Sequence, residues 1–108
     1  MNLLFICSRN NWRSPTAEAI YKNNQGINVK SAGTKPSARI KVTAKLIDWA
    51  DTIFVMEKRH KKSLTDKFPD HTSNKPIFTL DITDEYGYMD EEPIEIIKTS
   101  VATYLPYV

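Results

Sequence analysis

Apolar and polar residues alternate along the chain in blocks that predict strands and helices in turn. Short apolar runs at residues 3–6, 27–32, 52–56 and 76–80 predict four strands. The segments between and after them predict helices, beginning at Ser14-Pro15 and continuing at 43–50, 57–68 and 91–105. In the first helix, Ala17, Ile20 and Tyr21 form an apolar stripe, and Pro15 is expected at the first helical position.

Strands that alternate with helices are typical of a parallel sheet covered on both faces. We therefore expect an α/β fold with three layers, in which helices flank a four-stranded, mostly parallel sheet. The chain has 108 residues, of which 41% are hydrophobic and 26% charged, and it contains no repeats or linker-like segments. These features predict one domain over residues 1–108.

Charge and cysteine content exclude several classes of protein. The net charge of +2 is too small to indicate a nucleic-acid partner, and the single cysteine excludes an internal disulfide or a multi-cysteine zinc site. No apolar stretch predicts a membrane span or a signal peptide, so we expect a cytoplasmic protein without a membrane partner, cofactor or metal. The basic cluster at residues 58–62 is interpreted as a solvated helix face rather than a site for acidic partners.

The cysteine lies at the junction between the first predicted strand and the first predicted helix. Cys7 and Arg13 form a C-x5-R pattern that is followed directly by Ser14-Pro15. Such a loop can direct its backbone N–H groups inward to bind an anion, and Arg13 offers a planar pair of donors to two phosphate oxygens. The same positive field would stabilise the thiolate of Cys7 and make it nucleophilic. The pattern predicts a phosphate site directly above the sulfur.

Residues Cys7–Pro15 read C-S-R-N-N-W-R-S-P, and this stretch resembles the signature C-x-x-N-x-x-R-S-P of the low-molecular-weight protein tyrosine phosphatases. The segments Ser31–Thr34 and Ala50–Met56 match the same family. The resemblance implies a phosphatase that hydrolyses phosphate monoesters through a cysteinyl-phosphate intermediate. Its substrate would be a phosphorylated protein or small molecule, with protein phosphotyrosine as one candidate.

The resemblance also implies a role for each residue of the loop. Cys7 would be the nucleophile, Arg13 would bind the phosphoryl oxygens, and Ser14 would donate a hydrogen bond to the thiolate. Asn10 would hold the loop in shape with support from Ser31. The residues expected to contact the substrate are Ser8, Arg9, Asn10, Asn11, Trp12 and Arg13.

The general acid of the family is an aspartate in an Asp-Pro pair within a late loop. Asp84 aligns with that aspartate, but Glu85 replaces the proline. Asp81 and Asp90 lie in the same acidic loop and are rival candidates. We therefore predict Asp84 as the general acid and keep the other two as alternatives.

The chain also departs from the family pattern. It is shorter between Gly33 and Ala50, Trp12 replaces a second cysteine of the loop, and Arg9 replaces a glycine.

Three alternative functions are considered: an arsenate reductase, the phosphocysteine carrier of a sugar phosphotransferase system, and a phosphate-binding module with little catalysis. The first needs further cysteines, which the chain lacks, and the second has no use for an aligned general acid.

Overall fold

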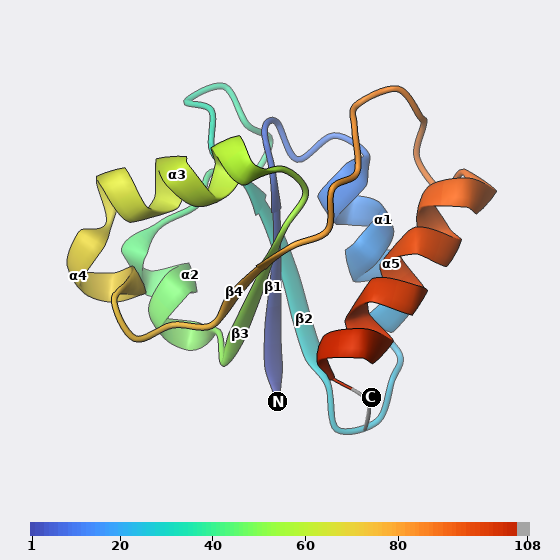
Figure 1. The fold of residues 1–108 in the computed structure, drawn as a ribbon, viewed down its shortest axis with the longest axis horizontal. Helices are drawn as coiled ribbons and strands as arrows, with labels where there is room; N and C mark the ends of the chain where they lie inside the picture. Colours follow the sequence, from blue (N-terminus) through green and yellow to red (C-terminus); the bar gives the residue numbers. More distant parts are fainter. Residues whose placement is uncertain (106–108) are drawn as a thin grey trace.

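Four parallel strands form the centre of the computed structural model, which describes residues 1–105 (Figure 1). The strands are β1 (Asn2–Cys7), β2 (Asn28–Gly33), β3 (Thr52–Val55) and β4 (Ile77–Thr79). Their order in the sheet is β2-β1-β3-β4, and each neighbouring pair is parallel. The predicted four-stranded parallel sheet is confirmed.

Helices cover both faces of the sheet because the strands are apolar on both sides. On β1, Leu3 and Phe5 pack on the side of α1 (Arg13–Tyr21) and α5 (Glu91–Tyr104). Leu4 and Ile6 pack on the opposite side. That side carries α2 (Ala44–Trp49), α3 (Lys58–Lys67) and α4 (Pro69–Thr72), as Figure 1 shows. Apolar residues on both faces are typical of a parallel strand covered by two helical layers, so the expected three-layer fold is confirmed.

Two helix boundaries differ from the prediction for reasons of proline chemistry. Helix α1 begins at Arg13, which makes Pro15 its third residue rather than its first. The first four N–H groups of a helix have no partner within it, so proline is tolerated throughout the first turn. The segment predicted as one helix over 57–68 ends at Lys67, and Pro69 begins a separate short helix. Within residues 1–105, no helix combines the length and the apolar character needed to cross a bilayer.

The loop that follows β2 is hydrogen-bonded to the loop that follows β1. Thr34 N–H donates to Cys7 O at 2.9 Å, and Lys35 N–H donates to Ser8 O at the same distance. Gly33 permits this approach, because a Cβ atom there would lie 2.5 Å from Ser8 O. The two loops therefore form one rim at the carboxyl edge of the sheet.

Candidate active site

Cys7 lies at the carboxyl end of β1, where the loop of residues 8–12 leads into α1. Strand β1 is central and has β2 on one side and β3 on the other, so the chain reverses its direction of winding at this strand. Parallel α/β sheets bind ligands at such a point, beyond the carboxyl ends of the strands. The side chain of Cys7 is 2% exposed, which places its sulfur at the floor of the loop.

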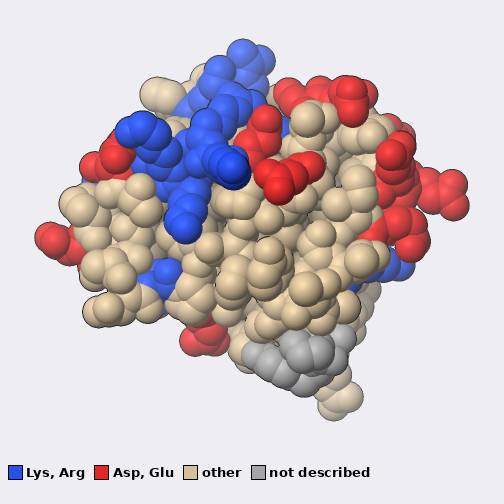
Figure 2. Space-filling model, in the orientation of Figure 1, with Lys and Arg blue, Asp and Glu red and all other residues tan. Residues whose placement is uncertain are grey.

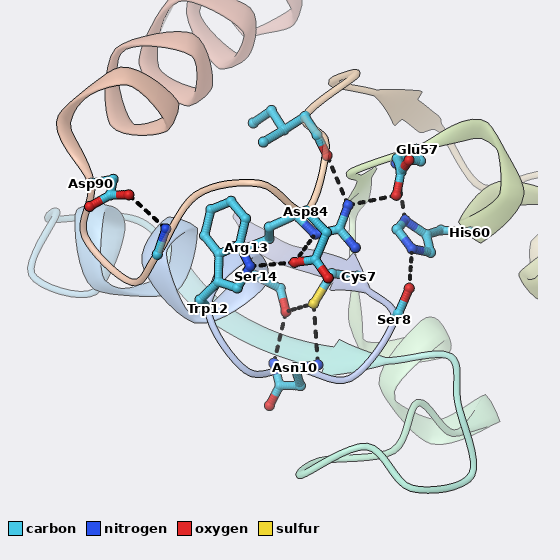
Figure 3. Close-up of polar contacts among 12 residues, drawn as sticks. Cys7, Ser8, Asn10, Trp12, Arg13, Ser14, Glu57, His60, Asp84 and Asp90 are labelled. Carbon is cyan, nitrogen blue, oxygen red and sulfur yellow. Dashed lines mark hydrogen bonds and ion pairs between the residues drawn. The ribbon is translucent and has the colours of Figure 1, made fainter.

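Two hydrogen bonds converge on the sulfur of Cys7 (Figure 3). The backbone N–H of Asn10 donates to Sγ at 3.2 Å. The hydroxyl of Ser14 lies 3.0 Å from Sγ. Donors at these positions stabilise a negative charge on sulfur more than a neutral thiol.

Asn10 holds the loop by adopting a left-handed backbone conformation, with φ 58°, and by binding two serines. Its Nδ2 donates to Ser14 Oγ at 2.8 Å and to Ser31 Oγ at 2.9 Å. Asparagine tolerates this conformation better than most residues. Ser31 donates its own hydrogen to Glu18 Oε1, so it accepts from Asn10. Ser14 Oγ also accepts from Asn10, and its own hydrogen can point either at the sulfur or at Ala32 O, which lies 3.3 Å from Oγ.

Arg13 is also buried at the base of the site, with 2% exposure. Its Nη1 donates to Glu57 Oε2 at 2.6 Å and to Ile82 O at 2.8 Å. These bonds use only Nη1, and a guanidinium fixed in this way can still offer its other donors to the oxygens of a phosphoryl group. Partial burial raises the pKa of Glu57, but the hydrogen bonds and charges of Arg13 and Arg59 outweigh it and lower the pKa overall.

His60 connects the loop to the start of α3, a role that the sequence interpretation missed. The basic cluster at residues 58–62 was expected to be a solvated helix face. His60 in this cluster is instead only 1% exposed, and its Nε2 lies 2.9 Å from Ser8 Oγ. Its Nδ1 accepts the backbone N–H of Glu57 at 3.0 Å. In the neutral ring the proton must therefore be on Nε2, which donates to Ser8. Burial, followed by the charges of Arg13 and Arg59, lowers the pKa of His60 to about 4.

Of the three aspartates considered as general acid, only Asp84 lines the pocket that contains Cys7. Trp12 Nε1 donates to its Oδ1, and the same oxygen is 3.7 Å from Arg13 Nε. Asp81 lines a different hollow, beside Glu57. Asp90 accepts the backbone N–H of Gly87 and does not line the pocket.

Most of the residues predicted from the sequence line a pocket of about 270 Å³, and the others are buried behind its wall. The pocket is lined by Cys7, Ser8, Arg9, Asn11, Trp12, Arg13, Lys35, Arg59 and Asp84. Asn10, Ser14 and Ser31 are buried and act through the hydrogen bonds given above. Lys35 and Arg59 were not predicted to line the site. Within residues 1–105, no three His, Cys, Asp or Glu side chains form a group that could hold a metal ion.

This arrangement combines three chemical capabilities in one pocket. The sulfur of Cys7 is a nucleophile held among hydrogen-bond donors. Arg13 and the N-terminus of α1 provide positive charge for a tetrahedral anion. Asp84 offers a carboxyl group that can donate or accept a proton.

Comparison with known proteins identifies one family. A family model described as low molecular weight phosphotyrosine protein phosphatase matches residues 2–47. A protein-arginine-phosphatase of Geobacillus stearothermophilus is 30% identical, over 91% of this chain and 84% of the relative. The YwlE arginine phosphatase structure from the same organism has a TM-score of 0.75 at 25% identity and covers 97% of this chain and 93% of its own. A low molecular weight protein tyrosine phosphatase from Bacillus subtilis has a TM-score of 0.78 at 22% identity, with 99% of both chains covered.

The buried position of His60 predicts a specific loss of stability in acid. In the unfolded chain this histidine binds a proton near its ordinary pKa of 6.5, whereas the folded protein resists protonation until about pH 4. Its stabilising contribution is therefore complete above pH 6.5 and is lost between 6.5 and 4. Because the pKa of His60 is lowered from 6.5 to about 4, the free energy of unfolding that is lost amounts to roughly 3 kcal/mol.

The variant His60→Gln keeps a hydrogen-bond acceptor at this helix position but cannot titrate. From pH 7 to pH 4, the free energy of unfolding, measured by urea denaturation, should fall by roughly 3 kcal/mol more in the wild type than in His60→Gln. His71→Gln, which removes an exposed histidine, should retain the wild-type pH dependence. Parallel curves for wild type and His60→Gln would show that His60 is not held neutral by its surroundings.

Proposed function

The chain belongs to the low-molecular-weight phosphotyrosine protein phosphatase family and is a cysteine-dependent phosphatase, and from this premise we propose that it removes phosphoryl groups from arginine side chains of proteins. The relative that is 30% identical is named a protein-arginine-phosphatase. In this proposal residues 1–108 act as one catalytic domain, since a single sheet edge carries Cys7, Arg13 and their supports.

The polar wall of the pocket is the observation that favours phosphoarginine. Trp12 is the only aromatic residue among those that line the described pocket, and the others are polar, charged or Cys7 itself. A phenyl ring is best held between two apolar surfaces, whereas a guanidino group needs hydrogen-bond acceptors. Asn11 and Asp84 both carry acceptor oxygens and line the pocket. Trp12 adds an aromatic surface on which a planar cation can stack.

Cys7 is the proposed nucleophile of the first step. Its sulfur donates an electron pair to phosphorus while the P–N bond breaks, and the bonding pair goes to the guanidino nitrogen. Asp84 donates a proton to that nitrogen, so arginine leaves as a guanidinium cation. Arg13 and the backbone N–H groups of the loop stabilise the charge on the phosphoryl oxygens during transfer.

In the second step, water hydrolyses the cysteinyl-phosphate. The Asp84 carboxylate accepts a proton from water as its oxygen attacks phosphorus, and the S–P bond breaks. Ser14 and the Asn10 N–H support this step, because both lie within hydrogen-bond distance of the sulfur that becomes a thiolate again. Inorganic phosphate then leaves, and the carboxyl group of Asp84 is protonated for another cycle.

Phosphotyrosine remains a second candidate because of one aromatic contact. The Trp12 ring meets the Tyr86 ring edge to face, with centroids 6.1 Å apart. This pair offers one aromatic wall to a phenyl ring, and the matched family model carries the phosphotyrosine name. The two substrates differ in the basicity of the leaving group and in the acceptors they need.

The proposal predicts a clear preference in a direct comparison of substrates. Two peptides of identical sequence, one with phosphoarginine and one with phosphotyrosine, should differ in kcat/KM by about five- to 150-fold in favour of phosphoarginine, because an unsatisfied polar wall costs about 1 to 3 kcal/mol. Phosphate release measures both rates, and p-nitrophenyl phosphate serves as the general substrate. Cys7→Ser should abolish release from all three.

The opposite preference would replace phosphoarginine by phosphotyrosine as the substrate. No release from any substrate by the wild type would instead favour the phosphate-binding module. In either case the matched peptides separate the choice of substrate from the presence of catalysis.

Asp84→Asn should slow hydrolysis according to the basicity of the leaving group. A guanidino nitrogen needs a proton to leave, whereas p-nitrophenolate is stable without one. We expect kcat/KM, which reports the first step, to fall by about 10²- to 10⁴-fold for the phosphoarginine peptide and much less for p-nitrophenyl phosphate. Asp81→Asn and Asp90→Asn are the matched controls, because neither residue lines the pocket. If Asp81→Asn shows the leaving-group dependence and Asp84→Asn does not, the role belongs to Asp81.

A further inference from the structure

Three cationic side chains surround the mouth of the pocket above the buried Cys7 and Arg13. Arg9 and Lys35 are exposed, and the side chain of Arg59 is 56% exposed. Figure 2 shows Lys and Arg side chains gathered on the α3 side of this face, whereas Asp and Glu side chains gather toward α5. The mouth is therefore polarised, with an excess of positive charge on one side.

Two of these cations are not neutralised by the protein. Arg59 forms an ion pair with Glu57 at 2.8 Å, and Glu57 is shared with Arg13. Within residues 1–105, the side chains of Arg9 and Lys35 form no ion pair. Cations that lie together without counter-charges produce a local field that attracts anionic ligands.

The backbone fixes where these two residues lie. Lys35 N–H donates to Ser8 O, and Arg39 N–H donates to Arg9 O at 3.0 Å. The side chain of Arg39 also donates to Asn10 O at 3.1 Å. Residues 34–39 are thereby held against the loop that carries Cys7. These bonds set the Cα positions of Arg9 and Lys35 relative to the sulfur.

We propose that Arg9 and Lys35 form a second anion site, which binds the carboxylate of an aspartate or glutamate adjacent to the phosphorylated residue of a protein substrate. This inference rests on the proposed function, in that a phosphorylated protein side chain occupies the Cys7 pocket. It adds a preference for acidic sequence around that residue. Residues at the floor of the pocket bind the phosphoryl group. Arg9 and Lys35 at its mouth favour substrates with an acidic residue next to the phosphorylated one.

The same charges act differently on substrate and product. A phosphoarginine side chain carries a net negative charge, whereas the product arginine is a cation. Arg9 and Lys35 therefore attract the substrate and repel the product side chain. An adjacent carboxylate adds to the attraction in the complex with substrate, where it lies next to the two cations.

Matched peptides test the second site. The phosphorylated residue is flanked by glutamate, alanine or lysine in otherwise identical peptides, and kcat/KM is measured for each. In the wild type, kcat/KM should rise from the lysine to the alanine to the glutamate peptide. The ratio of glutamate to alanine should be about three- to tenfold, since each exposed ion pair contributes up to about fivefold. Raising the ionic strength should reduce this ratio, because salt screens exposed charges.

The double variant Arg9→Gln/Lys35→Gln should bring the glutamate-to-alanine ratio close to one. Lys67→Gln/Lys98→Gln removes the same amount of charge from residues that do not line the pocket, and should retain the wild-type ratio. A wild-type ratio of one, or an unchanged ratio in the Arg9/Lys35 variant, would overturn the inference.

Running the series with both phosphoarginine and phosphotyrosine separates this inference from the proposed function. If only phosphotyrosine peptides are hydrolysed, and with the acidic preference, the second site stands and phosphoarginine is wrong as the substrate. If phosphoarginine peptides are hydrolysed without regard to their flanks, phosphoarginine stands and the second site is wrong. If kcat/KM of the Arg9/Lys35 variant falls by the same factor for the glutamate, alanine and lysine peptides, the two cations bind the phosphoryl group itself. That result would overturn the second site.

Discussion

The two hydrogen bonds from the side-chain amide of Asn10 determine the shape of the loop around Cys7. Asn10 is fully buried, with a left-handed backbone, and it joins the loop to Ser14 at the start of α1 and to Ser31 on β2. A buried polar group is costly unless it is bonded, and these bonds satisfy both amide hydrogens of Asn10, whereas its Oδ1 has no partner within residues 1–105. Because Ser14 Oγ accepts from Asn10, its own hydrogen can point at the sulfur of Cys7 or at Ala32 O. The position of this hydroxyl beside the sulfur thus follows from one amide.

Charge is arranged around this loop in layers of increasing exposure. Arg13 is buried and held by Glu57, and Glu57 is held in turn by the start of α3. Removing one partner of such a partly buried pair is expected to be more costly than removing an exposed ion pair. The exposed cations at the mouth contribute little to folding and are free to act on a ligand. The buried charges thereby fix the geometry of the site, and the exposed cations set the electrostatic field at the mouth of the pocket.

Local patterns in the sequence were sufficient for the sheet and for the position of Cys7 between the first strand and the first helix. The four strands were predicted because each is a short apolar run, and Cys7 and Arg13 because their spacing matches an anion-binding loop. His60 and Lys35 could not be placed in this way. His60 is buried by its contact with Ser8, which lies 52 positions away in the sequence. Lys35 lines the pocket because neighbouring backbone bonds hold it beside Ser8. Such contacts depend on the assembled sheet and leave no periodic pattern along the chain.

Acid-quenched samples taken during hydrolysis of a phosphoarginine peptide test most directly whether Cys7 carries the phosphoryl group during turnover. Mass spectrometry of these samples should show a fraction of the chains heavier by one phosphoryl group, and peptide mapping should place that group on Cys7. The adduct should vanish when the substrate is consumed. Hydrolysis that proceeds at the wild-type rate with no phosphoryl group on Cys7 at any time, or equally well in Cys7→Ser, would show that Cys7 does not carry the phosphoryl group.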